Sequence, residues 1–141
     1  MSSRVCLLAG VFLVAVGCSQ QVSPPHTVPV SGSVTLHGKP ALGIRVTMHP
    51  QFSMGRITWG VVGETGWKGE FKIGTGAPGN GAPPGDYIVT FTKPKIISDP
   101  ELNGVETEVD DFEGKYSDPE QSPWKVKVVK GENDLGMFNL D

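Results

Sequence analysis

Three histidines, a run of carboxylates and three tryptophans are the side chains of this sequence with the most obvious chemical potential. His37 follows one expected strand and His49 ends the next, so the two imidazoles would approach each other if those strands pair. Two imidazoles without a His-x-x-x-His spacing are weak evidence for a metal site. We interpret both as exposed turn histidines. The alternative is a small hydrolase, or an accessory domain of an enzyme, that uses His37 and His49.

Carboxylates are concentrated between residues 95 and 123. Calcium prefers hard oxygen ligands, which makes Glu108, Asp110, Asp111 and Glu113 candidate metal ligands. The stretch Asp-Asp-Phe-Glu-Gly matches no ordered calcium loop, so we expect a solvated acidic insertion and no cofactor. The acidic residues of the segment are Asp99, Glu101, Glu106, Glu108, Asp110, Asp111, Glu113, Asp118 and Glu120.

The tryptophans could mark a binding surface. Trp67 stands in the turn 65–69, where an exposed ring could stack on a sugar, and it is the candidate ligand-binding residue of a carbohydrate-binding module. We expect a turn tryptophan to pack over its own strands instead. Trp124 shares the phase of Val126 and Val128, which predicts a place in the core.

Catalytic motifs are missing from the sequence. It contains no Gly-x-Ser-x-Gly elbow, and the stretch 74–79 lacks the Lys-Ser/Thr that completes a nucleotide-binding loop. We interpret that stretch as a plain flexible loop and expect no enzymatic activity. The formal net charge of −3 argues against a nucleic-acid partner, which would need a basic face.

The N-terminus is typical of an exported chain. Arg4 precedes an uncharged apolar run over residues 5–17, which is shorter than the roughly 20 residues of a membrane-spanning helix. The following Ala15-Val16-Gly17-Cys18 resembles the lipobox of bacterial lipoproteins. That resemblance implies a signal peptide over residues 1–17, acylation of Cys18, and a flexible tether over residues 18–27. It also implies a membrane-anchored protein on the periplasmic or outer surface of the envelope.

Period-two alternation over the rest of the chain predicts strands and no helices. Residues 28–36 alternate with Val30 and Val34 on one face, and residues 86–92 are rich in aromatic and β-branched side chains. In the last strand the inward phase slips by one residue, which predicts a β-bulge at Gly136-Met137. The expected strands cover residues 28–36, 44–48, 57–62, 71–73, 86–92, 124–128 and 135–140.

Seven short strands joined by turns favour a two-sheet sandwich over residues 28–141. Residues 74–85 are rich in Gly and Pro and predict an irregular loop. The segment from about 95 to 123 is too long for a simple connection and is expected as an acidic loop insertion.

Several segments together resemble the carboxypeptidase regulatory-like, or transthyretin-like, domains of bacterial lipoproteins. They are Val30-Ser31-Gly32-Ser33-Val34 with His37-Gly38-Lys39-Pro40, and Pro84-Gly85-Asp86-Tyr87 with the strand that follows. The resemblance implies a single seven-stranded transthyretin-like or Ig-like β-sandwich and no general activity. This chain departs from the pattern at Gly66-Trp67-Lys68-Gly69, where related chains often carry Asp-x-Asp-Gly.

Taken together, the sequence favours a non-catalytic, lipid-anchored binding or structural module of the cell envelope. The expected partners are membrane lipid, through acylated Cys18, and an envelope protein or polysaccharide that the sequence does not identify.

Overall fold

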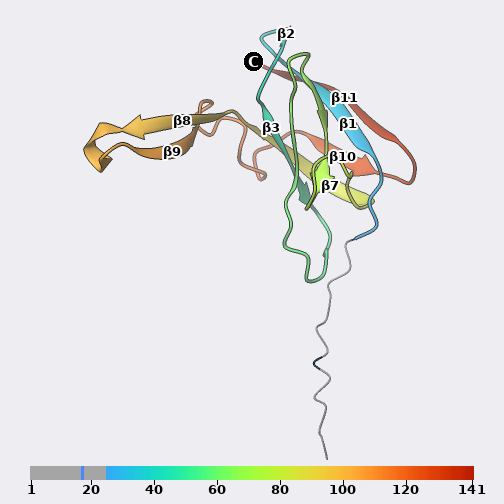
Figure 1. The fold of residues 1–141 in the computed structure, drawn as a ribbon. Coiled ribbons are helices and arrows are strands. Elements are labelled where there is room, and N and C mark those ends of the chain that lie inside the picture. Colours follow the sequence, from blue (N-terminus) through green and yellow to red (C-terminus); the bar gives the residue numbers. More distant parts are fainter. Residues whose placement is uncertain (1–16, 18–24) are drawn as a thin grey trace, which may run out of the picture.

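The computed structural model describes Gly17 and residues 25–141, and this described part is all-β. The expected signal peptide apart from Gly17, the predicted lipidation residue Cys18 and most of the expected tether lie outside the described residues. One turn of 3₁₀ helix, η1 (Pro100–Leu102), interrupts the strands. Within the described ranges, no helix is long and apolar enough to cross a membrane. Figure 1 shows two sheets with a long hairpin projecting from one side.

The first sheet is built around strand β1. One edge of β1 pairs with β11, the last strand, and the other edge pairs antiparallel with the short strands β2 and β5. The four strands of this sheet are β1 (Val30–Leu36), β2 (Lys39–Pro40), β5 (Glu70–Lys72) and β11 (Asn133–Leu140).

The pairing of β1 with β11 is parallel and contains the predicted bulge. Ser31 pairs with Asp134 but Ser33 pairs with Met137, so two residues of β11 oppose one residue of β1. Gly136 occupies the extra position with a φ of 77°, a left-handed conformation that glycine adopts without strain. The bulge turns Phe138 and Leu140 into the core.

The second sheet has five strands, all paired antiparallel. Its middle strands alternate, with Val46 and Met48 inward and Arg45, Thr47 and His49 outward. In order across the sheet the strands are β10 (Lys125–Val128), β7 (Gly85–Thr92), β3 (Arg45–Pro50), β4 (Val61–Glu64) and β6 (Gly74–Thr75).

Aromatic rings join the two sheets face to face. Phe91 of β7 and Phe138 of β11 have ring centroids 5.3 Å apart, and Trp124 meets Phe91 edge-on at 4.9 Å. Val34, Ile44 and the other apolar side chains around them are fully buried. Trp124 therefore belongs to the edge of the core, as its phase predicted.

Tyr87 fixes the start of the eight-residue core strand β7. Its ring is 1% exposed, and its hydroxyl donates a 2.6 Å hydrogen bond to the carbonyl of Pro83, four residues upstream. Phe52 packs edge-on against the ring at 5.4 Å. This arrangement, a tyrosine corner, anchors the turn that precedes β7.

The expected acidic loop insertion is in large part a hairpin. β8 (Pro94–Asp99) and β9 (Val105–Asp110) pair antiparallel along their whole length and extend away from the sandwich. The hairpin was missed because its side chains are mostly exposed on both faces, so no buried face marks it in the sequence. Residues 111–123 return to the sandwich through turns.

The expected seven strands correspond to β1, β3, β4, β5, β7, β10 and β11, but the described residues contain eleven. The two-residue strands β2 and β6 and the hairpin account for the difference. The third expected strand was placed too early, at 57–62, whereas β4 covers Val61–Glu64.

We expect Tyr87→Phe to destabilise the fold and to change its response to alkali. At neutral pH the buried Pro83 carbonyl loses its donor, at a cost of about 1–3 kcal/mol. Burial raises the pKa of Tyr87 from 10.0 to about 12. Because the folded state favours the protonated phenol, this contribution to stability is complete below the unfolded pKa and is lost as pH rises toward the folded value.

Denaturant unfolding at pH 8 and at about pH 11.5 measures both effects. The wild type and the control Tyr116→Phe should lose stability between the two conditions, and Tyr87→Phe should lose less. An equal loss in all three proteins would show that another group carries the alkaline response.

Candidate functional site

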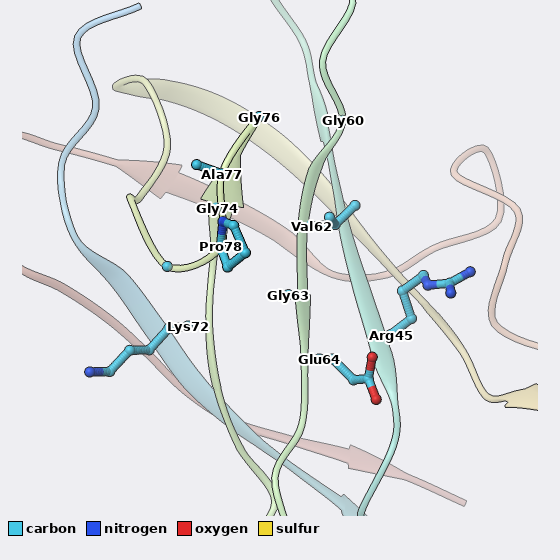
Figure 2. Close-up of a pocket in the computed structure, with 11 residues that line it drawn as sticks. Arg45, Gly60, Val62, Gly63, Glu64, Lys72, Gly74, Gly76, Ala77 and Pro78 are labelled. Atoms are coloured by element: carbon cyan, nitrogen blue, oxygen red, sulfur yellow. The ribbon is translucent and has the colours of Figure 1, made fainter. Parts of the chain in front are cut away.

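An open groove runs along the outer side of strands β4 and β6, with a cavity volume of about 750 Å³. Figure 2 shows the β4 backbone alongside the loop that holds Ala77 and Pro78. Val62 projects into this space and is 41% exposed. The groove is lined by Arg45, Gly60, Val62, Gly63, Glu64, Lys72, Gly74, Gly76, Ala77, Pro78 and Gly79.

Glycine makes the groove possible. A Cβ atom at Gly74 would lie 2.1 Å from the carbonyl oxygen of Ala77, and one at Gly63 would lie 2.7 Å from that of Lys72. These two positions therefore need glycine for close backbone packing. At Gly60 a Cβ would meet Val62 at an ordinary 3.6 Å, so this glycine leaves space that a side chain could fill.

The loop beside the groove is ordered by one asparagine. Asn80 accepts a 2.6 Å hydrogen bond from the backbone N–H of Thr75 and donates a 3.0 Å bond to the Thr75 carbonyl. The Thr75 hydroxyl is buried and donates to the carbonyl of Gly81. The expectation of a plain loop over residues 74–79 is wrong at its start, because Gly74 and Thr75 form strand β6, paired with β4 on one side and bonded to Asn80 through Thr75.

Arg45 closes one end of the groove and connects it to the hairpin. Its guanidinium makes two contacts with the Glu108 carboxylate, at 2.6 and 3.4 Å, while Glu64 lies opposite Arg45 on β4. The hydrogen bond with Glu108 raises the pKa of Arg45 and lowers the pKa of Glu108. Both side chains are partly exposed, so the ion pair orients the base of the hairpin more than it stabilises the fold.

Trp59 stands next to the groove. A Cβ atom at Gly76 would lie 2.8 Å from the Trp59 ring, so the indole covers this glycine closely. The ring is nevertheless 41% exposed. An indole that is held against backbone on one side and exposed on the other can stack on an apolar ligand face.

Trp67, the tryptophan singled out from the sequence, lies elsewhere. It is 75% exposed in the turn between β4 and β5, with the Lys68 ammonium 5.5 Å from its ring centre. It does not pack over its own strands as expected. Trp67 does not line the groove, which lies farther along β4.

The two histidines are not brought together. His37 is in the turn between β1 and β2, with a φ of 52°, whereas His49 is on β3 in the other sheet. Strands β1 and β3 do not pair, so the premise of a two-histidine site fails. His49 forms a 2.8 Å hydrogen bond with Thr90, and burial lowers its pKa.

The four acidic metal candidates serve different partners. Asp110 accepts backbone N–H bonds from Lys93, Phe112 and Gly114, which shapes the turn after the hairpin. Glu108 binds Arg45, and Asp111 lies 3.6 Å from the ammonium groups of two lysines. Glu113 is exposed in a turn with a φ of 53°. The described part of the chain contains no group of three or more His, Cys, Asp or Glu side chains placed to share a metal ion.

Sequence reasoning missed the groove and preferred Trp67 to Trp59 as the candidate ligand-binding tryptophan. A groove made by glycines has no side-chain pattern to detect: Gly74 and Gly76 were taken only as loop signals, and Gly60 was placed inside the strand expected over residues 57–62. The predicted lipidation residue, Cys18, lies outside the described residues and stays a prediction.

We expect Asn80→Ala to loosen the groove. The Thr75 N–H and carbonyl lose a side-chain partner, which should cost about 1–3 kcal/mol of stability. Amide hydrogen exchange of residues 74–81 should accelerate, while exchange in β7 should stay slow. Unchanged exchange at Thr75 would show that the loop is held by contacts other than Asn80.

No family model matches this chain, and no curated protein matches it. One solved structure, a 9R-lipoxygenase from Cyanothece, is similar at 14% identity with a TM-score of 0.44. The similarity covers 85% of this chain and 18% of that protein. At that TM-score the likeness carries no argument about fold or function.

Proposed function

We propose that this chain is a non-catalytic, lipid-anchored binding module of the bacterial cell envelope and that its ligand lies in the groove beside β4 and β6. The observation that carries the proposal is the groove itself. Its volume of about 750 Å³ and its glycine-lined wall provide a site of the size that proteins use for small or extended ligands.

The chemistry of the groove fits an uncharged polar ligand. Val62 and Pro78 offer apolar surface, and the charged groups stand at the rim, with Arg45 held by Glu108 and Lys72 directed away in Figure 2. Exposed glycine backbone supplies hydrogen-bonding groups without side chains in the way.

A polysaccharide segment is the second, narrower candidate. The observation in its favour is Trp59, whose exposed indole stands beside the groove at Gly76. The flat apolar face of a sugar ring can stack on such an indole while its hydroxyls reach the backbone of the groove. On this view the carbohydrate-binding residue is Trp59 and not Trp67.

The proposal also includes the lipid anchor at Cys18 and a relationship to the carboxypeptidase regulatory-like domains. The segment Ala15-Val16-Gly17-Cys18 supports acylation of Cys18, with two or more acyl chains holding the domain at a membrane. The Pro84-Gly85-Asp86-Tyr87 segment and the strand that follows it support kinship with carboxypeptidase regulatory-like domains. The exported location on the periplasmic or outer surface follows from the same N-terminus.

A groove-blocking pair of variants tests the ligand site. We expect Gly60→Leu and Val62→Arg to abolish binding on an array of envelope polysaccharides, because each side chain fills the groove without replacing a buried group. The matched control is Val129→Arg, which puts the same charge on a half-exposed valine beyond β10, at the opposite edge of the sheet. Binding that survives both groove variants would place the ligand elsewhere.

The two tryptophans are distinguished on the same array. We expect Trp59→Ala to weaken binding by at least about tenfold, the loss of one ring-stacking contact of roughly 1.5 kcal/mol. Trp67→Ala should leave binding unchanged. The opposite pattern would assign the sugar contact to the turn at Trp67.

Anchoring is tested by N-terminal mass spectrometry of membrane-fractionated full-length protein. We expect a diacyl or triacyl Cys18 in the wild type, and unprocessed or released protein for Cys18→Ala. Cleavage at another residue with an unmodified Cys18 would contradict lipid anchoring and leave the groove proposal standing.

A further inference from the structure

The outer edge of β8 is unpaired in the part of the chain that the structure describes. β8 pairs with β9 alone, and the hairpin lies clear of the sandwich in Figure 1. Ile96 and Ile97 are 58% and 41% exposed. An isolated two-stranded ribbon is marginally stable in water, and an exposed apolar edge is a template for another strand.

Prolines set the limits of this free edge. Pro94 begins β8 and Pro100 follows its last residue, and neither has an N–H to donate to a neighbouring strand. The pairing-competent stretch is therefore Lys95–Asp99.

The backbone direction along this stretch follows from two hydrogen bonds. The carbonyl oxygens of Lys93 and Asp99 accept from Asp111 and Gly104, so they point toward the β9 side. Backbone groups of successive residues point to opposite sides of a strand. The N–H and C=O groups of Ile96 and Ser98 consequently point outward, to the free edge.

We propose that β8 pairs antiparallel with β8 of a second copy of this chain, about a two-fold axis at Ile97. In this register Ile96 faces Ser98 of the second copy and Ser98 faces Ile96 of the second copy, which forms four backbone hydrogen bonds. A shift by two residues in either direction would place Pro94 or Pro100 in a donor position and lose part of the ladder.

The side chains complement each other in the same register. Ile97 meets Ile97 of the second copy at the axis, in a non-hydrogen-bonded pair whose side chains are close. Lys95 lies opposite Asp99 of the second copy on that same face, twice by symmetry. The existing contact of Lys95 with Asp111, at 3.6 Å, is exposed and weak and leaves Lys95 available.

Charge selects β8 over β9 as the pairing edge. Pairing of β9 with its own copy about Thr107 would set Glu106 opposite Glu108 of the second copy, and like charges directly opposite are destabilising. In the β8 arrangement the two β9 strands lie three strand spacings apart, about 14 Å, which exceeds a screening length of about 8 Å.

Disulfide trapping in full-length protein tests the arrangement. In an antiparallel non-hydrogen-bonded pair the Cα atoms are about 4.5 Å apart, within the range a disulfide bridges. We expect Ile97→Cys to give a reducible dimer under mild oxidation. The matched control is Thr107→Cys, which is paired with Ile97 on the same hairpin face but is too far from its own copy. The wild-type protein, oxidised in the same way, is the control for any disulfide-linked dimer that forms through the native Cys6 or Cys18.

Charge exchange provides the second readout. In the Ile97→Cys background, Lys95→Asp should reduce the trapped dimer by roughly fivefold, and the double change Lys95→Asp with Asp99→Lys should restore it. Equal trapping at Thr107→Cys, no trapping at Ile97→Cys, or no rescue by the double change would overturn the proposal. None of these outcomes depends on groove binding, so the two proposals fail separately.

Discussion

Apolar side chains hold the two sheets of this domain together. No disulfide can join the sheets, because the two cysteines of the sequence stand at positions 6 and 18, ahead of the first strand. The contact between Phe91 and Phe138 is at the centre of that packing. Phe138 reaches it because the bulge at Gly136 resets the phase of β11, and Phe91 reaches it because the Tyr87 corner sets the start of β7. The outward faces of β3 and β4, and so the groove, are positioned by the same packing.

Seven of the strands could be predicted from alternation and from aromatic and β-branched content, with β4 placed too early, and the bulge could be predicted from the broken phase after Leu135. The hairpin was not predicted, because Ile96 and Ile97 are adjacent apolar residues that remain exposed, and Val105, Thr107 and Val109 alternate with acidic residues without a buried face. Parallel pairing of the first and last strands also leaves no local signal, since it joins residues 104 positions apart, as at Thr35 and Asn139.

The candidate site shows a different limit of sequence reasoning. Attention to reactive side chains pointed to His37, His49 and the carboxylates near residue 110, and the fold separates these groups or commits them to turns and ion pairs. The groove instead depends on what is missing, the side chains of Gly60, Gly63 and Gly74. It also depends on Asn80, whose amide substitutes for a neighbouring strand. Such features emerge only when the backbone is seen in three dimensions.

The parallel pairing of β1 with β11 also determines the order in which the domain can fold. β1 leaves the ribosome first, yet it needs β11 to satisfy one whole edge, so the first sheet is incomplete until the chain through Leu140 is available. Contacts of such long sequence separation are slow to form, because the loop between them must be closed before they contribute. The first sheet of a nascent chain therefore stays open along one edge of β1 until β11 has been synthesised, whereas the strands of the second sheet can pair without β11.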